Sequence, residues 1–316
     1  MAAIEKRKKE KVTEMKVKIT WKEIKRQKAL LIWSAFIVLY GVIFCYLPLG
    51  GWLMAFQNYR PKDGLLHSQF VGLAKFQQLF SDATFLRVIR NTLAMGVINL
   101  VATFFMAILF AILLNDVKSQ GGKKVVQTIS YLPHFLSWVV IGAVAYQMFA
   151  TQSGVVNALI ANAGKSPIPF LQEDGWWLFS YVLIGVWQTM GWGTIIYLAA
   201  ITNVNSELYE AAKVDGANRW QQCLHVTLPC IRSTIVVMLI MQLGKLMGGS
   251  FERIVALSNA KATEFTTTIP VLVYKWFQGN KFSESTALGL FQSVIGVILV
   301  IASDRVAKKL GEDGLL

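Results

Sequence analysis

The chain has 316 residues, of which 54% are hydrophobic and only 16% are charged. Soluble domains carry about 25% charged residues, so this composition excludes a disordered chain and disfavours an ordinary soluble enzyme. The net charge of +13 is compatible with nucleic-acid binding or with a membrane protein, but no nucleic-acid-binding module accompanies the basic residues. Three cysteines and three histidines are scattered along the chain, so the sequence predicts no disulfide framework and no metal site.

Six apolar stretches, each about long enough to cross a bilayer, follow one another along the chain. They cover about residues 30–52, 88–114, 126–149, 177–200, 233–251 and 287–303. The sequence therefore predicts an all-α, polytopic membrane protein with about six transmembrane helices in a domain over residues 30–303. A basic tail over 1–29 precedes this domain and a short tail over 304–316 follows it.

The distribution of basic residues predicts the orientation. The first tail holds 11 Lys and Arg, and the loops at 115–127 and 201–232 and the second tail hold three each. Because Lys and Arg accumulate on the cytoplasmic side, both termini and these two loops are predicted to be cytoplasmic. The first tail is interpreted as an orientation signal that contacts lipid headgroups. A nucleic-acid partner is not expected.

The predicted outer loops differ in character. Between the first two spans, apolar residues at near-helical spacing predict a short amphipathic helix at the outer surface: Phe70, Leu73, Phe76, Leu79 and Phe80. Trp176 and Trp177 open the fourth span and predict an interfacial aromatic belt. The Thr-rich loop at 252–285 leaves two possibilities open, because it can fold back into the bundle or stand above it.

The loop at 201–232 is the most informative segment. Ser206 can cap a helix start, and apolar residues then recur at helical spacing. Asp215 and Gly216 form a turn signal, because glycine tolerates a positive φ and commonly ends helices. A second short helix is predicted at about 217–226, and Pro229 sets the entry to the fifth span. Two short helices that meet at Gly216 suit the transmission of force better than the binding of a small molecule.

These residues resemble the EAA motif of ABC importer permeases. The residues that carry the resemblance are Glu210, Ala211, Ala212, Asp215, Gly216, Ala217, Leu228 and Pro229. Segments 71–76, 90–92, 131–133, 187–188, 250–252 and 287–295 are similar to the sugar-permease branch, and 311–316 resembles the LplB-like group. Cys223 and Ser233 depart from the common pattern, which affects only the packing of the second short helix.

The resemblance implies the type I importer permease fold, a multi-pass location in a bacterial inner membrane and a set of partners. These are a second homologous permease, two ATP-binding subunits, an extracellular solute-binding protein and an oligosaccharide cargo. Glu210 and its neighbours would dock as a coupling helix on an ATP-binding subunit. ATP and Mg²⁺ would be bound there, with no cofactor bound by this chain, so the chain itself is not expected to be an enzyme. Gly164-Lys165-Ser166 resembles the end of a P-loop, but Leu159 stands where its first glycine belongs.

Polar and aromatic side chains at membrane depth are candidates for the substrate pathway. They are Trp187, Gln188, Trp192, Tyr197, Gln242, Lys245 and Glu252. Lys245 either lines the pathway and contacts an acidic or hydroxyl-rich cargo, or snorkels to the interface or pairs with Glu252. Aromatic residues of the fourth span are alternatively packing residues. A net positive outer side and Lys245 would suit an acidic sugar such as a uronate oligomer.

Two weaker signals and one rival function remain. Gly244 and Gly248 have a GxxxG spacing, which serves either contact with the partner permease or packing within this subunit. Asn99 is expected to make an interhelical hydrogen bond rather than to bind a ligand. The alternative function is an ion-gradient-driven secondary sugar transporter, which would require coupling carboxylates inside the spans. The predicted spans contain almost no acidic residue, and no nucleophile constellation supports a membrane enzyme.

Overall fold

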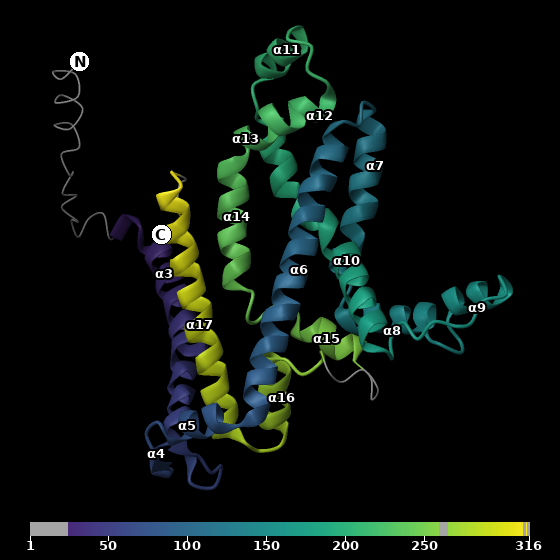
Figure 1. The fold of residues 1–316 in the computed structure, drawn as a ribbon. Helices are drawn as coiled ribbons and strands as arrows, with labels where there is room; N and C mark the ends of the chain where they lie inside the picture. Colours follow the sequence, from purple (N-terminus) through teal and green to yellow (C-terminus); the bar gives the residue numbers. More distant parts are fainter. Residues whose placement is uncertain (1–24, 259–264, 312–313, 315–316) are drawn as a thin grey trace. The chain divides into compact units, whose positions relative to one another are not determined.

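The computed structural model describes residues 25–258, 265–311 and 314. Most of the predicted basic tail at 1–29 lies outside these residues. The chain divides into two compact units, residues 1–53 and 54–316, which are described separately. Figure 1 shows that the described chain is helical almost throughout, as the sequence predicts.

In the first unit, helix α3 (Lys28–Gly41) continues into the π-helical turn η1 (Val42–Tyr46) and then into the 3₁₀ helix η2 (Leu47–Phe56). None of the α3 side chains is buried. A helix that is apolar all round is typical of a membrane span, because a water-facing helix carries a polar face. The segment Lys28–Phe56 is long and apolar enough to cross a membrane, which agrees with the first predicted span.

Three long helices of the second unit meet the same criteria for a membrane span: α6 (Ala83–Asn115), α10 (Asp174–Thr202) and α17 (Phe282–Lys309). The Asp82 carboxylate begins α6 by accepting a hydrogen bond from the backbone N–H of Thr84 at 2.7 Å. This bond and one from the Thr84 hydroxyl hold the pKa of Asp82 below its ordinary value. Helix α17 runs to Lys309, so it continues past the predicted boundary at residue 304.

The third and fifth predicted spans are each a bent pair of helical segments rather than one straight helix. Gln120–Phe135 and Trp138–Phe149 meet at 104°, and Arg219–Cys230 and Arg232–Gly244 meet at 66°. With each bent pair counted as one span, the described residues contain up to six spans. Their segments are α7 (Gln120–Tyr131), η3 (Leu132–Phe135), α8 (Trp138–Phe149), α12 (Arg219–Gln222), η4 (Cys223–Thr227), α13 (Leu228–Cys230) and α14 (Arg232–Gly244).

Local chemistry explains the first of these bends. Pro133 lies in the first turn of η3, Leu136 is extended, and the Ser137 side chain accepts a hydrogen bond from the Val140 N–H to begin α8. A proline lacks the donor that would continue the preceding helix, and a serine cap starts a new one.

Shorter elements complete the unit. Strand β1 (Gln57–Asn58) pairs antiparallel with β2 (Gln69–Phe70). The short helices are α4 (Gly64–His67), α5 (Ala74–Ser81), α9 (Val155–Asn162), α11 (Ser206–Val214), α15 (Phe251–Leu257) and α16 (Ile269–Gln278). Helix α5 confirms the predicted amphipathic helix, although Phe70 and Leu73 lie before its first residue.

The segment predicted as an outer loop at 252–285 folds back into the bundle. Helix α15 packs against α8, and α16 packs against α17 and α6. Residues 259–264 of this segment lie outside the described residues. Helix α5 packs on α17, where Lys75 Nζ lies 2.8 Å from Glu284 Oε1.

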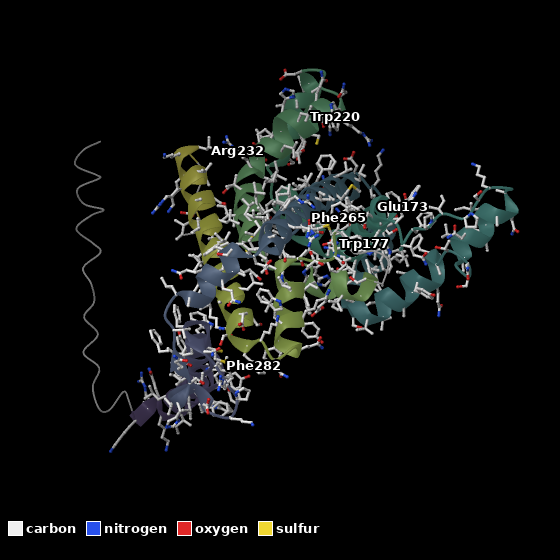
Figure 2. All side chains as sticks on the ribbon, turned by 60° about the horizontal axis from the view of Figure 1, so that its bottom comes forward. Glu173, Trp177, Trp220, Arg232, Phe265 and Phe282 are labelled. Carbon is white, nitrogen blue, oxygen red and sulfur yellow. The ribbon has the colours of Figure 1, made fainter. Side chains whose placement is uncertain are left out.

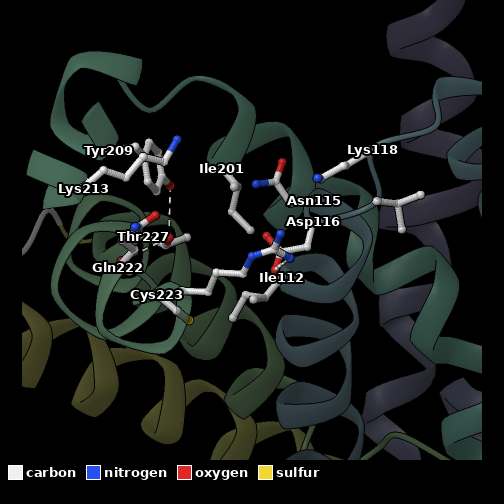
Figure 3. A pocket seen from close by; sticks show the side chains of 12 residues that line it. Ile112, Asn115, Asp116, Lys118, Ile201, Tyr209, Lys213, Gln222, Cys223 and Thr227 are labelled. Atoms are coloured by element: carbon white, nitrogen blue, oxygen red, sulfur yellow. Dashed lines mark hydrogen bonds and ion pairs between the residues drawn. The ribbon is translucent and has the colours of Figure 1, made fainter. Parts of the chain in front are cut away.

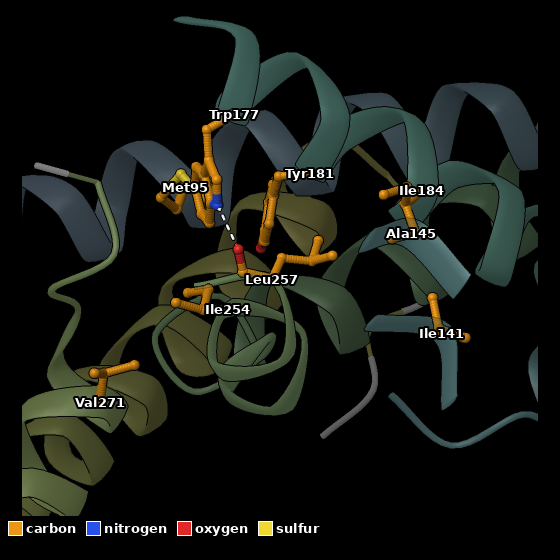
Figure 4. Packing of buried hydrophobic residues seen from close by; sticks show 9 residues of the cluster. All are labelled: Met95, Ile141, Ala145, Trp177, Tyr181, Ile184, Ile254, Leu257 and Val271. Carbon is orange, nitrogen blue, oxygen red and sulfur yellow. Dashed lines mark hydrogen bonds between the residues drawn. The ribbon is translucent and has the colours of Figure 1, made fainter. Parts of the chain in front are cut away.

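Helix α10 lies along α6 and contributes to two of the clusters of buried hydrophobic side chains. One cluster contains Met95, Trp177, Tyr181 and Ile254 (Figure 4). Trp177 is 1% exposed and its Nε1–H donates to the Leu257 carbonyl at 2.9 Å. Trp177 is therefore a core residue, which corrects its predicted place in an interfacial belt, whereas Trp176 is 37% exposed.

Candidate coupling site and membrane pathway

Residues 201–232 form a helical hairpin at the end of the second unit where α6 ends and α7 begins (Figure 1). Its first arm is α11. The helix is capped by Asn205, whose side chain accepts a hydrogen bond from the Glu207 N–H at 3.0 Å. The predicted cap, Ser206, is instead the first helical residue, because the amide oxygen of the preceding asparagine already binds the free N–H.

The predicted turn at Gly216 is confirmed. Asp215 is the C-cap of α11, and Gly216 has a φ of +80°. The Gly216 N–H donates to the Lys213 carbonyl at 3.0 Å and the Ala217 N–H donates to the Ala212 carbonyl at 2.9 Å. These two bonds make a Schellman motif, which satisfies carbonyls that the end of a helix leaves free.

The second arm differs from the single predicted helix at 217–226. Asn218 and Gln221 form a reciprocal capping box at the start of α12, and the chain then widens into the π-helical turn η4 before α13. Pro229 has no N–H to offer the carbonyl four residues earlier, which a continuous α-helix would require. The Leu228 N–H accordingly bonds to the carbonyl of Cys223, five residues back.

Three side-chain contacts brace the hairpin. The Tyr209 hydroxyl on α11 lies 3.0 Å from the Thr227 hydroxyl, and the Gln222 side-chain amide donates to the Ala217 carbonyl at 2.8 Å. Arg219 Nη1 lies 3.6 Å from the Asp116 carboxylate at the end of α6. These residues line a cavity of about 350 Å³ between the hairpin, α6 and α10 (Figure 3). Of these contacts, the one between Arg219 and Asp116 joins the hairpin to the end of α6.

The hairpin brings the predicted coupling residues together on one projection. Ala212, Ala217 and Leu228 are half-buried, while the other five predicted coupling residues are exposed: Glu210, Ala211, Asp215, Gly216 and Pro229. Two apolar side chains beside them are exposed. Val214 is 88% exposed. Trp220, labelled in Figure 2, is 67% exposed. Exposed apolar groups on a rigid projection suit the docking of a partner protein.

The predicted pathway residues are distributed over α10, the end of α14 and the start of α15. Trp187 and Trp192 are exposed on α10, and Trp192 stacks on His134 with ring centroids 4.7 Å apart. Gln188 is buried. Tyr197, 1% exposed, packs edge-on to Phe104 in a core cluster.

The remaining predicted pathway residues lie at the end of the fifth span. Helix α14 ends at Gly244, seven residues before the predicted end of the span, so Lys245 is its C-cap. Gln242 is half-buried, and Lys245 and Glu252 are exposed. No ion pair joins Lys245 to Glu252 within the described part of the chain.

The structure resolves the two interpretations of the GxxxG spacing. A Cβ on Gly244 would lie 2.6 Å from Val300 Cγ2, and one on Gly248 would lie 2.9 Å from Gln292 Nε2. Both glycines therefore allow close packing against α17 within this subunit. The interhelical hydrogen bond expected of Asn99 is also present, and its donor is Arg253 at 2.6 Å.

Arg253 on α15 is the residue that the sequence analysis missed. It is 3% exposed, and its guanidinium lies 4.1 Å from the centre of the Tyr181 ring. A lone arginine in an apolar segment is a recognisable signal, but residues 252–285 were assigned to an outer loop, where a charge needs no explanation. Tyr209 and Thr227 were missed because their contact joins positions 18 residues apart.

Comparison with known proteins agrees with this architecture. Residues 104–311 match the family described as "Binding-protein-dependent transport system inner membrane component". The chain is 43% identical, over 88% of its length and 87% of the relative's, to the polygalacturonan/rhamnogalacturonan transport system permease protein YteP of Bacillus subtilis (strain 168). It is 38% identical, over 94% of both chains, to protein LplB of the same organism.

Among solved structures, this chain resembles a chain of a bacterial alginate ABC transporter, crystallised in complex with an alginate pentasaccharide-bound periplasmic protein. The TM-score is 0.84 and the identity 35%, over 93% of this chain and 99% of that chain. The family match covers the hairpin and every helix after it. This chain therefore belongs to the family of inner membrane components of binding-protein-dependent transport systems.

Proposed function

We propose that this chain is the permease subunit that forms part of the translocation pathway of an ATP-driven oligosaccharide importer. The hairpin at 201–232 docks on an ATP-binding subunit, and its braced contacts to α6 pass the movement to the membrane helices. The observation that carries this proposal is the exposed apolar tip of the hairpin, with Val214 and Trp220, on a base fixed by Tyr209, Thr227 and Arg219.

The assembly contains a second homologous permease, two ATP-binding subunits and an extracellular solute-binding protein. ATP and Mg²⁺ are bound by the ATP-binding subunits, and this chain binds no cofactor. Glu210 braces the coupling helix or contacts the ATP-binding subunit, while Ala211 and Ala212 allow its close approach. The periplasmic protein in the related alginate complex supports the solute-binding partner.

Both termini and the hairpin face the cytoplasm. The basic residues of the first tail, of loops 115–127 and 201–232 and of the last tail support this orientation. Within the second unit, the C-terminal end of α17 and the hairpin lie at the same end (Figure 1), which supports a location on the same side of the membrane.

The cargo is an acidic oligosaccharide that contains uronate residues. Relatives named for polygalacturonan and rhamnogalacturonan and for alginate support this choice. The net positive charge of the predicted outer loops and the exposed Lys245 favour an anionic cargo. An ion-gradient-driven transporter is the alternative, and it is disfavoured because α6 has no acidic residue and α10 has one only at its first position, Asp174.

Reconstitution of the full complex in liposomes with its binding protein tests the proposal. Uptake of an oligogalacturonide is expected to require ATP on the cytoplasmic side and to be insensitive to the dissipation of proton and sodium gradients. Uptake without ATP, driven by an ion gradient, overturns the importer. Equal uptake of neutral and acidic oligosaccharides overturns the acidic cargo alone.

A matched pair of variants tests the docking surface. Val214→Glu, at the hairpin tip, is expected to abolish co-purification of the ATP-binding subunits, because it places a charge in an apolar contact. Leu66→Glu is the control, since Leu66 is 89% exposed at the opposite end of the unit and Val214 is 88% exposed. Retention of the ATP-binding subunits by both variants contradicts docking through the hairpin.

A further inference from the structure

Arg253 is a buried cation, and its hydrogen-bond partners among the described residues are all neutral. Its guanidinium donates to the Asn99 side-chain oxygen at 2.6 Å, to the Ser250 hydroxyl at 3.0 Å and to the Tyr181 carbonyl at 3.3 Å. It also lies over two aromatic rings, 4.1 Å from the centre of Tyr181 and 5.2 Å from that of Trp138. These contacts orient the guanidinium and compensate for lost hydration.

Within the part of the chain that the structure describes, the positive charge itself is not neutralised. No carboxylate pairs with Arg253 among residues 25–258, 265–311 and 314. Its Nε–H is buried without a hydrogen-bond partner. A guanidinium stays protonated in proteins, so the site retains a full positive charge in a poorly screened environment. A buried ionic group is usually paired, and an intramembrane charge without a counter-ion suggests a function.

The local backbone places this charge beside an interruption in the fifth span. Helix α14 has 13 residues and is therefore about 20 Å long, shorter than the hydrocarbon core of a bilayer. Residues 245–250 are non-helical, and Ser250 has a φ of +90°. Irregular backbone at membrane depth is tolerated where it is buried in protein or lines a water-filled cavity. Lys245, which is exposed, begins this interruption, and Arg253 follows it.

Helix α10 makes room for the guanidinium. A Cβ on Gly185 would lie 1.5 Å from Arg253 Nη1, so any other residue at position 185 would displace the charged group. The site is thus assembled around Arg253 of α15 from neutral groups of α6, α8 and α10 and from the space that Gly185 leaves.

We propose that Arg253, together with Lys245 at the start of the interruption, selects for acidic cargo by attracting the carboxylates of a uronate oligosaccharide to the 245–250 segment. This inference rests on the proposed import function and names the residue that determines its substrate class. Arg253 acts from within the wall of the pathway, as a fixed and weakly screened charge held in place by Asn99, Ser250 and Tyr181. A neutral oligosaccharide has no carboxylate for that charge to attract.

The variant Asn99→Asp tests the inference, because it keeps the shape of the side chain and adds a carboxylate next to the guanidinium. The complete transporter with saturating binding protein is assayed for ATP-dependent uptake of trigalacturonate and of its methyl-esterified form. The ratio of kcat/KM for the acid to that for the ester is expected to fall at least tenfold. The rate for the ester stays within about twofold, and the melting temperature of the complex does not fall, since a buried cation gains a counter-ion.

Two further variants separate charge from packing. Asn162→Asp adds the same charge on the exposed surface of α9 and is expected to leave the ratio unchanged. Arg253→Lys keeps the charge but loses the planar fork, so an assembled complex retains the preference for the acid even if its melting temperature falls. Loss of the preference in assembled Arg253→Lys, or an unchanged ratio in Asn99→Asp, shows that Arg253 only packs the helices.

The outcomes also distinguish this inference from the proposed function. A wild-type complex that does not import trigalacturonate with ATP contradicts the proposed function. A wild-type complex that imports it, while Asn99→Asp imports acid and ester in the wild-type ratio, contradicts only the role of Arg253.

Discussion

Replacement of Gly216 isolates the contribution of one backbone angle to coupling. The residue has a φ of +80°, and no atom lies within 4 Å of the place where a Cβ would be. A substitution therefore creates no steric clash within the subunit and acts through backbone strain. The left-handed conformation costs an ordinary L-residue about 1–2 kcal/mol, less for asparagine and more for a β-branched residue. That cost shifts the equilibrium between the formed and the opened turn about 5- to 30-fold.

The series Gly216→Asn, Gly216→Ala and Gly216→Val separates this strain from bulk at the docking surface. Coupling is measured as the number of oligosaccharides imported per ATP hydrolysed in proteoliposomes that contain the complete transporter. We expect coupling to decrease from wild type to Gly216→Asn, then to Gly216→Ala and then to Gly216→Val, because these residues tolerate a positive φ in that order. A clash with the ATP-binding subunit would instead place the small alanine ahead of the larger asparagine.

Better coupling in Gly216→Ala than in Gly216→Asn refutes the backbone argument. Full coupling in Gly216→Val refutes any role of the turn. Co-purification of all subunits is the control, since a variant that fails to assemble reports on stability rather than on coupling.

Three further predictions concern the scaffold. Asn157 is 2% exposed and makes hydrogen bonds at 2.8, 2.9 and 3.1 Å across the α9 segment. Asn157→Ala is therefore expected to lower the free energy of unfolding by about 2–3 kcal/mol and to speed proteolysis between residues 150 and 173. Asn162→Ala, at an exposed position of the same helix, is expected to do neither. Gly191→Ala places a Cβ 2.0 Å from a carbonyl oxygen of α7 and is expected to cost about 1–3 kcal/mol in thermal stability; Gly289→Ala, with no atom within 4 Å, is the neutral control. The Asp82 cap has a lowered pKa, so its stabilisation is fully present above the unfolded-state pKa and is lost as the pH falls through the lowered folded-state pKa. The difference in melting temperature between wild type and Asp82→Ala should therefore be constant from pH 7 to 5 and become smaller only below about pH 4. If this difference already becomes smaller near neutral pH, the Asp82 carboxylate is not the source of the stabilisation.

The parts of the fold that the sequence predicts are those set by short-range signals. Each span needs only a run of apolar residues of sufficient length, and the six predicted stretches correspond to the helices and bent pairs that could cross a membrane. The turn at Gly216 is likewise local, since both hydrogen bonds of its Schellman motif join residues at most five positions apart.

Hydropathy does not reveal bends or buried polar detail. The stretch at 126–149 is predicted as one span, yet Pro133 and Ser137 divide it into segments at 104°. Helices α15 and α16 fold into the bundle although residues 252–285 lack the length and continuity of a span. Their burial depends on partners supplied by α8, α6 and α17, which no window of neighbouring residues contains.

The same distinction separates the two functional parts of the molecule. The coupling hairpin holds its shape with contacts between residues at most 18 positions apart, apart from the Arg219–Asp116 bridge, so a motif of about twenty residues is enough to identify it. The site of Arg253 joins residues 72 and 154 positions apart, so no short motif marks it in the sequence. A docking surface shared by a family can be local in the chain, whereas a charge that selects cargo must be placed by the packing of several helices. Substrate selection in this permease is therefore a property of the tertiary structure, and exchange of α15 alone between relatives should not transfer it unless Asn99 and Gly185 are exchanged with it.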